Sequence, residues 1–304
     1  MNKIIKQAFT LIELLVVIAI IGILSGLIVV SMSGMTTKAT VAKAQVFSNS
    51  LRNSLMMNLV SDWTFDGSGV SDGSAVNSSY LQDTWSQKNG SVTVAPPTVL
   101  SGTNCVSGSC LSFNGSQYVS IPYDSAFNFG TQMTAMVWMK TNLTTEKVVI
   151  GQLDSYSGQR SWLIESYPIS KIAVYLSDDG TNNSGHRKYY KTPIDNNWHL
   201  VGFTWNTGVV KVYIDGLETN LEKAYDDPIT TIYPSNNINL LIGACFTNGS
   251  PSLYFTGQID GARLYNVAIS TSQIREQYYA GLNSLLTSGQ INKEEYQNRL
   301  VGIK

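Results

Sequence analysis

Residues 198–216 read WHLVGFTWNTGVVKVYIDG and carry the clearest strand signals in the chain. Val210, Val212 and Ile214 are two residues apart, so they share one face of an extended strand. The preceding run, Trp198–Trp205, alternates in the same way, and an Asn-Thr-Gly segment connects the two runs. Asp-Gly follows Ile214, and this pair is a favoured two-residue hairpin turn. The stretch therefore predicts consecutive antiparallel strands.

Short apolar runs of the same kind continue on both sides of this stretch. From Trp63 onward, short apolar runs are separated by clusters of Gly and Ser, which is typical of all-β architecture. We therefore predict a β-sandwich over residues 61–281. Residues 271–280 have helical character, and the tail over residues 282–304 is predicted to form two short helices about Gly289.

The composition excludes some classes of function. Charged residues make up 13% of the chain, against about 25% in an average soluble protein. Ser, Thr, Asn and Gly take their place, which suits a secreted protein rich in strands and loops. The net charge is −1, so no nucleic-acid partner is predicted, because nucleic-acid binding needs a concentrated basic patch.

A different pattern occupies the N-terminus. Residues 1–8 contain Lys3 and Lys6 but no acid, and residues 9–32 are almost continuously apolar. A helix over this run is roughly 36 Å long at 1.5 Å per residue, enough to cross a bilayer core. The positive leader predicts that residues 1–8 stay in the cytoplasm while the rest is exported. Because apolar residues continue at helical spacing, we predict one long helix over residues 9–60.

Glu13 interrupts the apolar run, and a carboxylate inside a membrane needs an opposite charge. The segment Lys6–Leu14, KQAFTLIEL, resembles the class III signal of type IV pilins and pseudopilins. The resemblance implies that a prepilin peptidase cuts between Ala8 and Phe9 and that the new amine of Phe9 is methylated. Glu13 would then pair with the amine of a neighbouring subunit during assembly. The chain departs from the family at Ala8, where Gly normally precedes the cut. A plain signal anchor is the alternative.

The pilin resemblance also implies partners and a location. Expected partners are other pilin subunits, the prepilin peptidase and the inner-membrane assembly machinery. Before assembly the chain would be a single-pass protein of the cytoplasmic membrane, and afterwards it would belong to an extracellular filament on the cell surface.

The body of the chain resembles the laminin-G-like, concanavalin A-like jelly roll over roughly residues 61–280. Each marker segment is short, but the segments stand in the order of that family. They are Trp63–Asp66, Leu111–Val119, Ala135–Lys140, Asn197–Leu200, Val212–Gly216, Ile242-Gly243 and Phe255–Ser270. This resemblance implies an extracellular, lectin-like domain.

The same resemblance implies a structural calcium ion between the first strand and the last strands. Asp66 and Asp260 occupy the acidic positions of those motifs, and Ca²⁺ prefers carboxylate oxygens. The alternative is that both side chains only cap turns.

Three cysteines are present. Cys105 and Cys110 flank a short Ser/Gly loop at a spacing that a disulfide can close. Two thiols at this spacing could instead form half of a metal site, although the sequence contains no second pair of Cys or His to complete it. We favour the disulfide. Cys245 lies in an apolar run and is predicted to be buried.

Catalytic patterns are absent from the sequence. Glycoside hydrolases need paired acids, whereas Glu146, Glu165, Glu218 and Glu222 are isolated from one another in the sequence. His199 lies in a predicted strand and is expected to be packed, and His186 is expected to be exposed in a polar loop. We therefore predict that the protein is not an enzyme.

A sugar is the expected ligand of a lectin-like domain. The loops around Tyr156–Trp162 and Asn182–Tyr190 combine aromatic rings with polar groups, so Tyr156, Trp162, Asn182 and Tyr189 are the candidate ligand-binding residues. The resulting hypothesis is a pilin-like filament subunit that displays an adhesive, glycan-binding or surface-binding domain. The alternatives are a purely structural pilin or pseudopilin whose sandwich makes subunit contacts and, third, a glycoside-active enzyme.

Overall fold

The structure is a computed structural model of the chain. It describes residues 11–12, 14–22, 55–92, 95–142, 145–167, 171–181, 186–191, 195–219, 221–226 and 229–302, with only the backbone of 186–191 and 221–226. The chain divides into two compact units, Met1–Ser54 and Leu55–Lys304. Ala8, Phe9, Glu13 and Asn182 lie outside the described residues.

In the first unit, residues 11–12 and 14–22 are helical, and apolar side chains such as Leu11 and Ile12 are exposed. Among the described residues, no helix is both long enough and apolar enough to cross a membrane. Most of the predicted helix over 9–60 falls outside the described residues. At its far end the prediction is wrong, because helical residues stop at Met56, and Leu59 and Val60 already belong to a strand.

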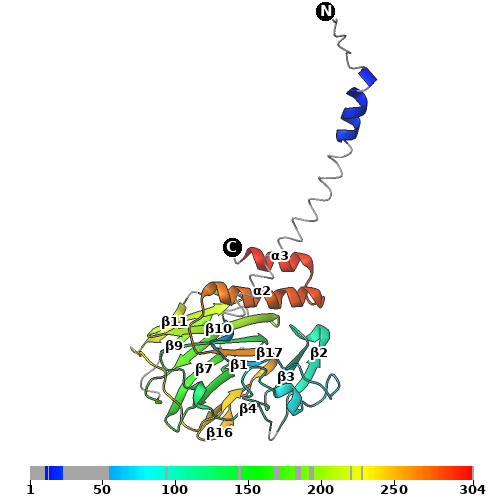
Figure 1. Ribbon diagram of the computed structural model, residues 1–304. Coiled ribbons are helices and arrows are strands. Elements are labelled where there is room, and N and C mark those ends of the chain that lie inside the picture. Colours follow the sequence, from blue (N-terminus) through cyan, green and yellow to red (C-terminus); the bar gives the residue numbers. More distant parts are fainter. Residues whose placement is uncertain are drawn as a thin grey trace, which may run out of the picture. The chain divides into compact units, whose positions relative to one another are not determined.

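The second unit is a β-sandwich, which confirms the predicted architecture (Figure 1). In the first sheet the strand order is β12 (Leu217–Glu218), β11 (Val209–Ile214), β10 (Trp198–Asn206), β5 (Gln132–Lys140), β17 (Thr256–Tyr265), β3 (Ser109–Asn114) and β2 (Thr98–Ser101), with β1 (Leu59–Trp63) also paired to β17. In the second sheet it is β13 (Leu221–Asp226), β9 (His186–Lys191), β8 (Lys171–Leu176), β7 (Gln159–Tyr167), β6 (Lys147–Asp154), β14 (Leu240–Ile242) and β4 (Val119–Ile121), with β15 (Cys245–Thr247) and β16 (Ser250–Ser252) attached beside β6. Short 3-10 turns lie at η1 (Ser78–Leu81), η2 (Gly102–Asn104) and η3 (Ser125–Phe127).

The hairpin predicted from residues 198–216 is confirmed. Strands β10 and β11 pair in antiparallel register, with Val201 opposite Ile214. Asp215 and Gly216 have φ values of 53° and 78°. These are the positive angles that a tight hairpin turn requires, and the turn leads from β11 into β12.

The inner faces of the two sheets enclose the main core. Trp162 packs between Phe129 and Phe203, with ring-centroid distances of 6.2 and 6.0 Å. Trp63 on β1 lies 6.3 Å from the ring of Phe127. Because each strand alternates its side chains between the two faces, the other face of each sheet remains for a helix, a loop or a ligand.

Two helices cover the outer face of the first sheet (Figure 1). Helix α2 (Thr271–Thr287) begins with a capping box between Ser270 and Gln273, and α3 (Lys293–Val301) follows. The ring of Trp138 stacks on Tyr278 at 5.7 Å. Our prediction that a separate helix begins at residue 282 is wrong, because α2 continues to residue 287. The predicted break about Gly289 is confirmed, and this residue has a φ of 77°.

Candidate functional site

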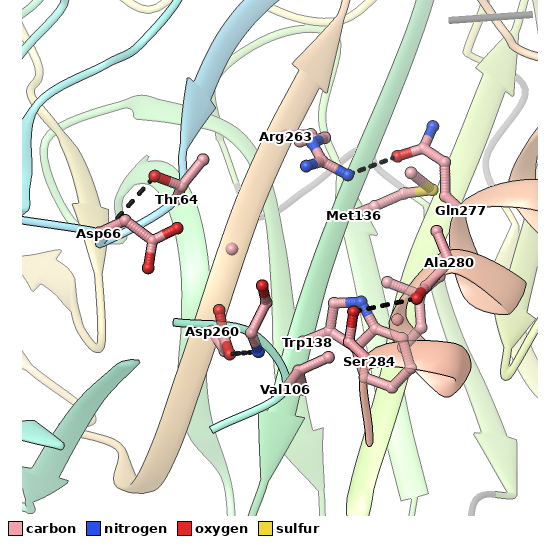
Figure 2. Close-up of a pocket in the computed structure, with 14 residues that line it drawn as sticks. Thr64, Asp66, Val106, Met136, Trp138, Asp260, Arg263, Gln277, Ala280 and Ser284 are labelled. Carbon is pink, nitrogen blue, oxygen red and sulfur yellow. Dashed lines mark hydrogen bonds between the residues drawn. The ribbon is translucent and has the colours of Figure 1, made fainter. Parts of the chain in front are cut away.

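A cavity of about 190 Å³ lies between the outer face of the first sheet and α2 (Figure 2). The two predicted calcium ligands, Asp66 and Asp260, both line it. Its other lining residues come from the segment after β1, from β5, β10, β17 and α2, and from the loop closed by the two cysteines. They are Thr64, Val106, Ser107, Met136, Trp138, Leu200, Gly261, Arg263, Gln277, Ala280, Gly281 and Ser284.

The loop between the cysteines holds both carboxylates in place. The backbone N–H of Ser107 donates to Asp260 Oδ2 at 2.9 Å, and that of Ser109 donates to Asp66 Oδ1 at 2.8 Å. Gly108 permits this approach, because its φ is 53° and a Cβ there would lie 1.9 Å from Asp66 Oδ1. The loop therefore binds β17 to the segment that follows β1.

The two acids have unusual protonation equilibria. Burial raises the pKa of Asp260 to about 8; the N–H of Ser107 opposes this shift and the nearby Asp66 carboxylate adds to it. Burial also raises the pKa of Asp66, against the opposing N–H of Ser109. Arg263 does not neutralise them directly, because its Nε donates to Asp62 Oδ1 at 2.9 Å. Two adjacent carboxylates whose charge is poorly compensated fit a hard cation such as Ca²⁺.

The structure joins Cys105 and Cys110 in a disulfide, with a Cα–Cα distance of 5.5 Å. Of the two alternatives left open by the spacing, it is the disulfide that is present. Cys245 is a buried free thiol, as predicted. Burial raises its pKa to about 11, although a hydrogen bond with Ser252 opposes the shift. The thiol is therefore protonated at neutral pH and is a poor nucleophile.

A second cavity, of about 450 Å³, lies on the outer face of the second sheet. We call it the outer-face cavity. Its floor is apolar and is built from Leu153, Leu163, Tyr175, Cys245 and Leu253. These residues come from β6, β7, β8, β15 and the position just after β16, so the cavity exists only because the β15–β16 hairpin folds against β6.

Polar groups surround this apolar floor. The Arg160 guanidinium lies 5.8 Å above the ring of Tyr175 and donates to the backbone carbonyl of Ser155 at 2.6 Å. Ser155 Oγ donates to Thr247 Oγ1 at 3.2 Å, and Thr247 is hydrogen-bonded in turn to the hydroxyl of Ser252. The cavity thus combines an aromatic ring, a positively charged guanidinium and a chain of hydrogen-bonded hydroxyl groups.

The fold places two acids that are isolated in the sequence around one cavity. Glu146 precedes β6 and Glu165 lies on β7, and both line the outer-face cavity. Lining the same cavity is not by itself the paired arrangement that hydrolysis needs, so the prediction of no catalytic pair stays a prediction. Glu218 lies on β12 of the other sheet.

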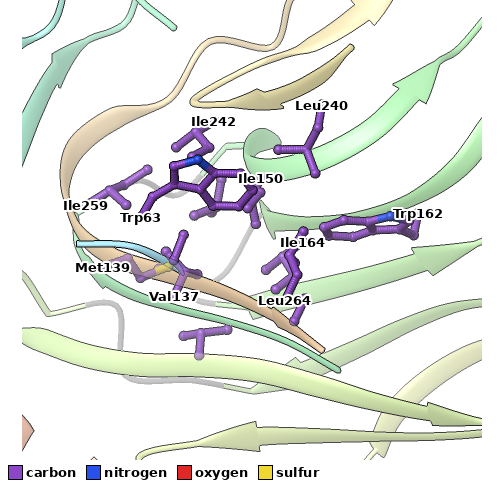
Figure 3. Packing of buried hydrophobic residues seen from close by; sticks show 14 of the residues in the cluster. Trp63, Val137, Met139, Ile150, Trp162, Ile164, Leu240, Ile242, Ile259 and Leu264 are labelled. Carbon is purple, nitrogen blue, oxygen red and sulfur yellow. The ribbon is translucent and has the colours of Figure 1, made fainter. Parts of the chain in front are cut away.

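The candidate sugar-binding residues have different outcomes. Tyr156 lines the outer-face cavity and is 76% exposed. Trp162 is 0% exposed inside the core (Figure 3), so its assignment as a ligand-binding residue is wrong. Its neighbour Leu163 faces the cavity instead, because adjacent strand residues point to opposite faces. Tyr189 lies on β9, and its side chain is outside the described residues.

Both histidines belong to strands. His199 is 7% exposed, with Nδ1 2.7 Å from Asp215 Oδ2 and Nε2 3.0 Å from Asp195 Oδ1. Burial lowers its pKa, but the contacts with the two carboxylates outweigh burial and raise it. The predicted packing of His199 is confirmed. The loop position predicted for His186 is wrong, because this residue begins β9.

Sequence reasoning missed Arg160, Tyr175 and the hydroxyls of Thr247 and Ser252. The sequence carries no signal for them as a group, because they come from three separate parts of the chain that meet through strand pairing. Of the residues that line this cavity, only Tyr156 was named from a local pattern, in the loop around Tyr156–Trp162 that also contains Arg160.

The fold and its cavities define a β-sandwich of the lectin type. Residues 113–275 match the family model described as the concanavalin A-like lectin/glucanases superfamily. The chain belongs to this family. Residues 5–29 match the prokaryotic N-terminal methylation motif, so the prepilin-type N-terminus is also established.

Solved structures agree with this fold. The binding domain of Paraclostridial Mosquitocidal Protein 1 superposes with a TM-score of 0.54 at 14% identity, covering 75% of this chain and 53% of that structure. The ligand binding domain of botulinum neurotoxin serotype D, in complex with N-acetylneuraminic acid, superposes with a TM-score of 0.52 at 16% identity, covering 76% and 53%. The chain thus spans about half the length of these structures. No curated protein sequence matches it significantly.

Proposed function

We propose that this protein is a type IV pilin-like filament subunit that displays a lectin-like domain for adhesion to a glycan or a cell surface. The methylation motif over residues 5–29 supports the assembly half of the proposal. Cleavage between Ala8 and Phe9 would leave an N-methylated Phe9, and Glu13 would pair with the amine of a neighbouring subunit. The prepilin peptidase, the inner-membrane assembly machinery and other pilins are then the partners, and the cell surface is the final location.

The assembly half is tested on purified filaments. Intact-mass analysis is expected to find a chain that begins at Phe9 and carries one additional methyl group. A chain that still begins at Met1 or Asn2 would contradict processing and leave the plain signal anchor. Replacing Ala8 by Gly restores the usual residue before the cut and is expected to keep or speed processing.

The outer-face cavity carries the adhesion half. An apolar floor that contains an aromatic ring can stack against the C–H face of a sugar, and flanking hydroxyl, guanidinium and carboxylate groups can bind its hydroxyls. The outer face of the first sheet is covered by α2 and α3, whereas this cavity is open and has Tyr156 at its rim. A glycan would therefore bind on the second sheet.

Glycan-array binding by the full-length protein in detergent tests this assignment. The wild type is expected to bind, Tyr156→Ala to lose most of the signal, and Tyr156→Phe to retain it because the ring remains. Val209→Ala, on an exposed position of the other sheet, is the control. Binding that survives in Tyr156→Ala would move the site elsewhere. Silence of the wild type on a broad array would favour the structural alternative, in which the sandwich only makes subunit contacts.

A second function is favoured by one observation, the presence of Glu146 and Glu165 in the same cavity. Glycoside hydrolysis uses two carboxyl groups on either side of the bond that is cut. Release of reducing ends from neutral oligosaccharides, lost in Glu165→Gln while binding persists, would establish an enzyme. Binding without release of reducing ends by the wild type would leave a lectin.

We also propose that the domain binds a structural calcium ion through Asp66 and Asp260. The ion would neutralise two carboxylates whose pKa values are raised in its absence. Calcium is then expected to raise the thermal midpoint of the wild type but not that of Asp260→Asn. A midpoint that is the same with calcium and with chelator would discard the ion.

A further inference from the structure

The Cys105–Cys110 disulfide lies beside a buried carboxylate, and the three side chains together are potential metal ligands. The sulfur atoms of Cys105 and Cys110 and a carboxylate oxygen of Asp260 all lie within 4.8 Å of one another, and all three residues are buried. Thiolate and carboxylate groups are ligands of Zn²⁺ and similar thiophilic cations. The sequence alone shows two of these ligands. The fold brings in the third from β17, which is 150 residues away along the chain.

The surroundings suit a bound ion. Asp260 is 4% exposed, and Ser107 N–H fixes its orientation through Oδ2. A carboxylate has about four lone-pair positions, so this bond does not exhaust it. Val106 and Ser107 also line the 190 Å³ cavity, which leaves room for a water molecule as a fourth ligand. The side chain of Gln290 donates to the carbonyl oxygen of Cys105 and covers the other side of the loop.

We infer that reduction of the Cys105–Cys110 disulfide turns this corner into a binding site for a thiophilic divalent cation such as Zn²⁺ or Cd²⁺. A dithiol or a phosphine supplies the two electrons: the S–S bond breaks, two thiols form, and the reductant becomes a cyclic disulfide or, with water, a phosphine oxide. The cation then displaces one proton from each thiol and the proton that the buried Asp260 carboxyl carries in the metal-free protein, and it is held by two thiolates and the Asp260 carboxylate.

Oxidation removes this site. Disulfide sulfurs carry no charge and are poor ligands, whereas thiolates bind such cations strongly. The carboxylates of Asp66 and Asp260 remain in the oxidised protein, and they suit a hard cation instead. The redox state of one disulfide therefore selects the class of cation at this corner. A thiophilic cation bound before oxidation would also hold the two cysteines in the reduced state.

The test is a Cd²⁺ titration of the full-length protein in detergent, reduced with a phosphine that is then removed. One Cd²⁺ per chain is expected to produce a thiolate-to-cadmium charge-transfer band in the ultraviolet and to release protons. Cys105→Ser is expected to abolish the band and Asp260→Asn to weaken binding roughly tenfold or more. Cys245→Ala, which removes only the separate buried thiol, is expected to leave the band unchanged.

The oxidised wild type is the second control, because it has the same sequence and needs no substitution to fold. Absence of the band there and its presence after reduction support the site. The inference is overturned if the reduced wild type gives no band, if the oxidised protein gives the same band, or if Cys105→Ser retains it. Loss of the band in Cys245→Ala alone would place the cation at the wrong thiol and would also overturn the inference.

Discussion

Replacing Asp260 by Asn is expected to change how the stability of the metal-free domain depends on pH. Asp260 is buried on β17, and burial raises the pKa of its carboxyl to about 8. An Asp in an unfolded chain has a pKa of about 3.9. Asn has nearly the same shape and can accept the N–H of Ser107, but it does not titrate.

The sign follows from where the proton resides. Between about pH 4 and pH 8 the folded protein keeps the proton on Asp260 and the unfolded chain loses it, so unfolding releases a proton. Stability is therefore greatest below the unfolded pKa and falls as the pH rises toward the folded pKa. The slope is about 1.4 kcal/mol per pH unit. From pH 5 to pH 7.5 the wild type should lose about 3 kcal/mol through this one group.

Urea unfolding of the full-length protein in detergent and chelator, followed by tryptophan fluorescence, measures the difference. We expect the wild type to lose stability from pH 5 to pH 7.5 and Asp260→Asn to lose about 3 kcal/mol less over that range. Asp124→Asn is the control, because Asp124 caps a surface turn and Asn caps equally well. Parallel pH profiles for the wild type and Asp260→Asn would refute the reasoning.

Three further outcomes concern other parts of the domain. Gly281→Ala should destabilise the domain by about 1–3 kcal/mol in urea unfolding, because a Cβ there would lie 2.3 Å from Trp138. The neighbouring substitution Ala280→Gly is the control, and it should lower the free energy of unfolding by only about 1 kcal/mol because glycine has a lower helix propensity. A Gly281→Ala variant that is more stable than the wild type would contradict the packing against Trp138. Because the pKa of His199 is raised in the folded protein, its contribution to stability is complete below about pH 6.5 and is lost as the pH rises through the pKa of the folded state. His199→Gln should therefore flatten that part of the plot of unfolding free energy against pH. An unchanged plot would contradict the ion pairs. Trp162→Ala should cost about 3–5 kcal/mol without altering sugar specificity, and altered specificity in a still-folded variant would contradict its place in the core.

Local patterns were sufficient where structure depends on neighbouring residues. Alternation and an Asp-Gly pair predicted β10, β11 and their turns, since strand period and turn type are set within a few residues. The helix break about Gly289 was predicted for the same reason. The end of the N-terminal helix was predicted at residue 60, although helical residues stop at Met56, because Leu59 and Val60 continue the apolar spacing but belong to β1, which pairs with β17.

The candidate site was predicted only in part. Asp66 and Asp260 were found from motif order, and they do share a cavity. Tyr156 was found from its aromatic loop, but Trp162 in the same segment faces the core. A shift of one residue along a strand moves a side chain to the other face, so a short aromatic segment cannot reveal which ring meets a ligand.

The sequence by itself determined the methylation motif, the sandwich architecture and the paired spacing of Cys105 and Cys110, because each depends on residues close together in the chain. Only the tertiary structure decided which distant groups meet. Strand pairing places Glu146 and Glu165 around one cavity and brings the Asp260 carboxylate close to the sulfur atoms of the disulfide. Such encounters depend on sheet order and register, which arise from the packing of the whole domain rather than from any one segment.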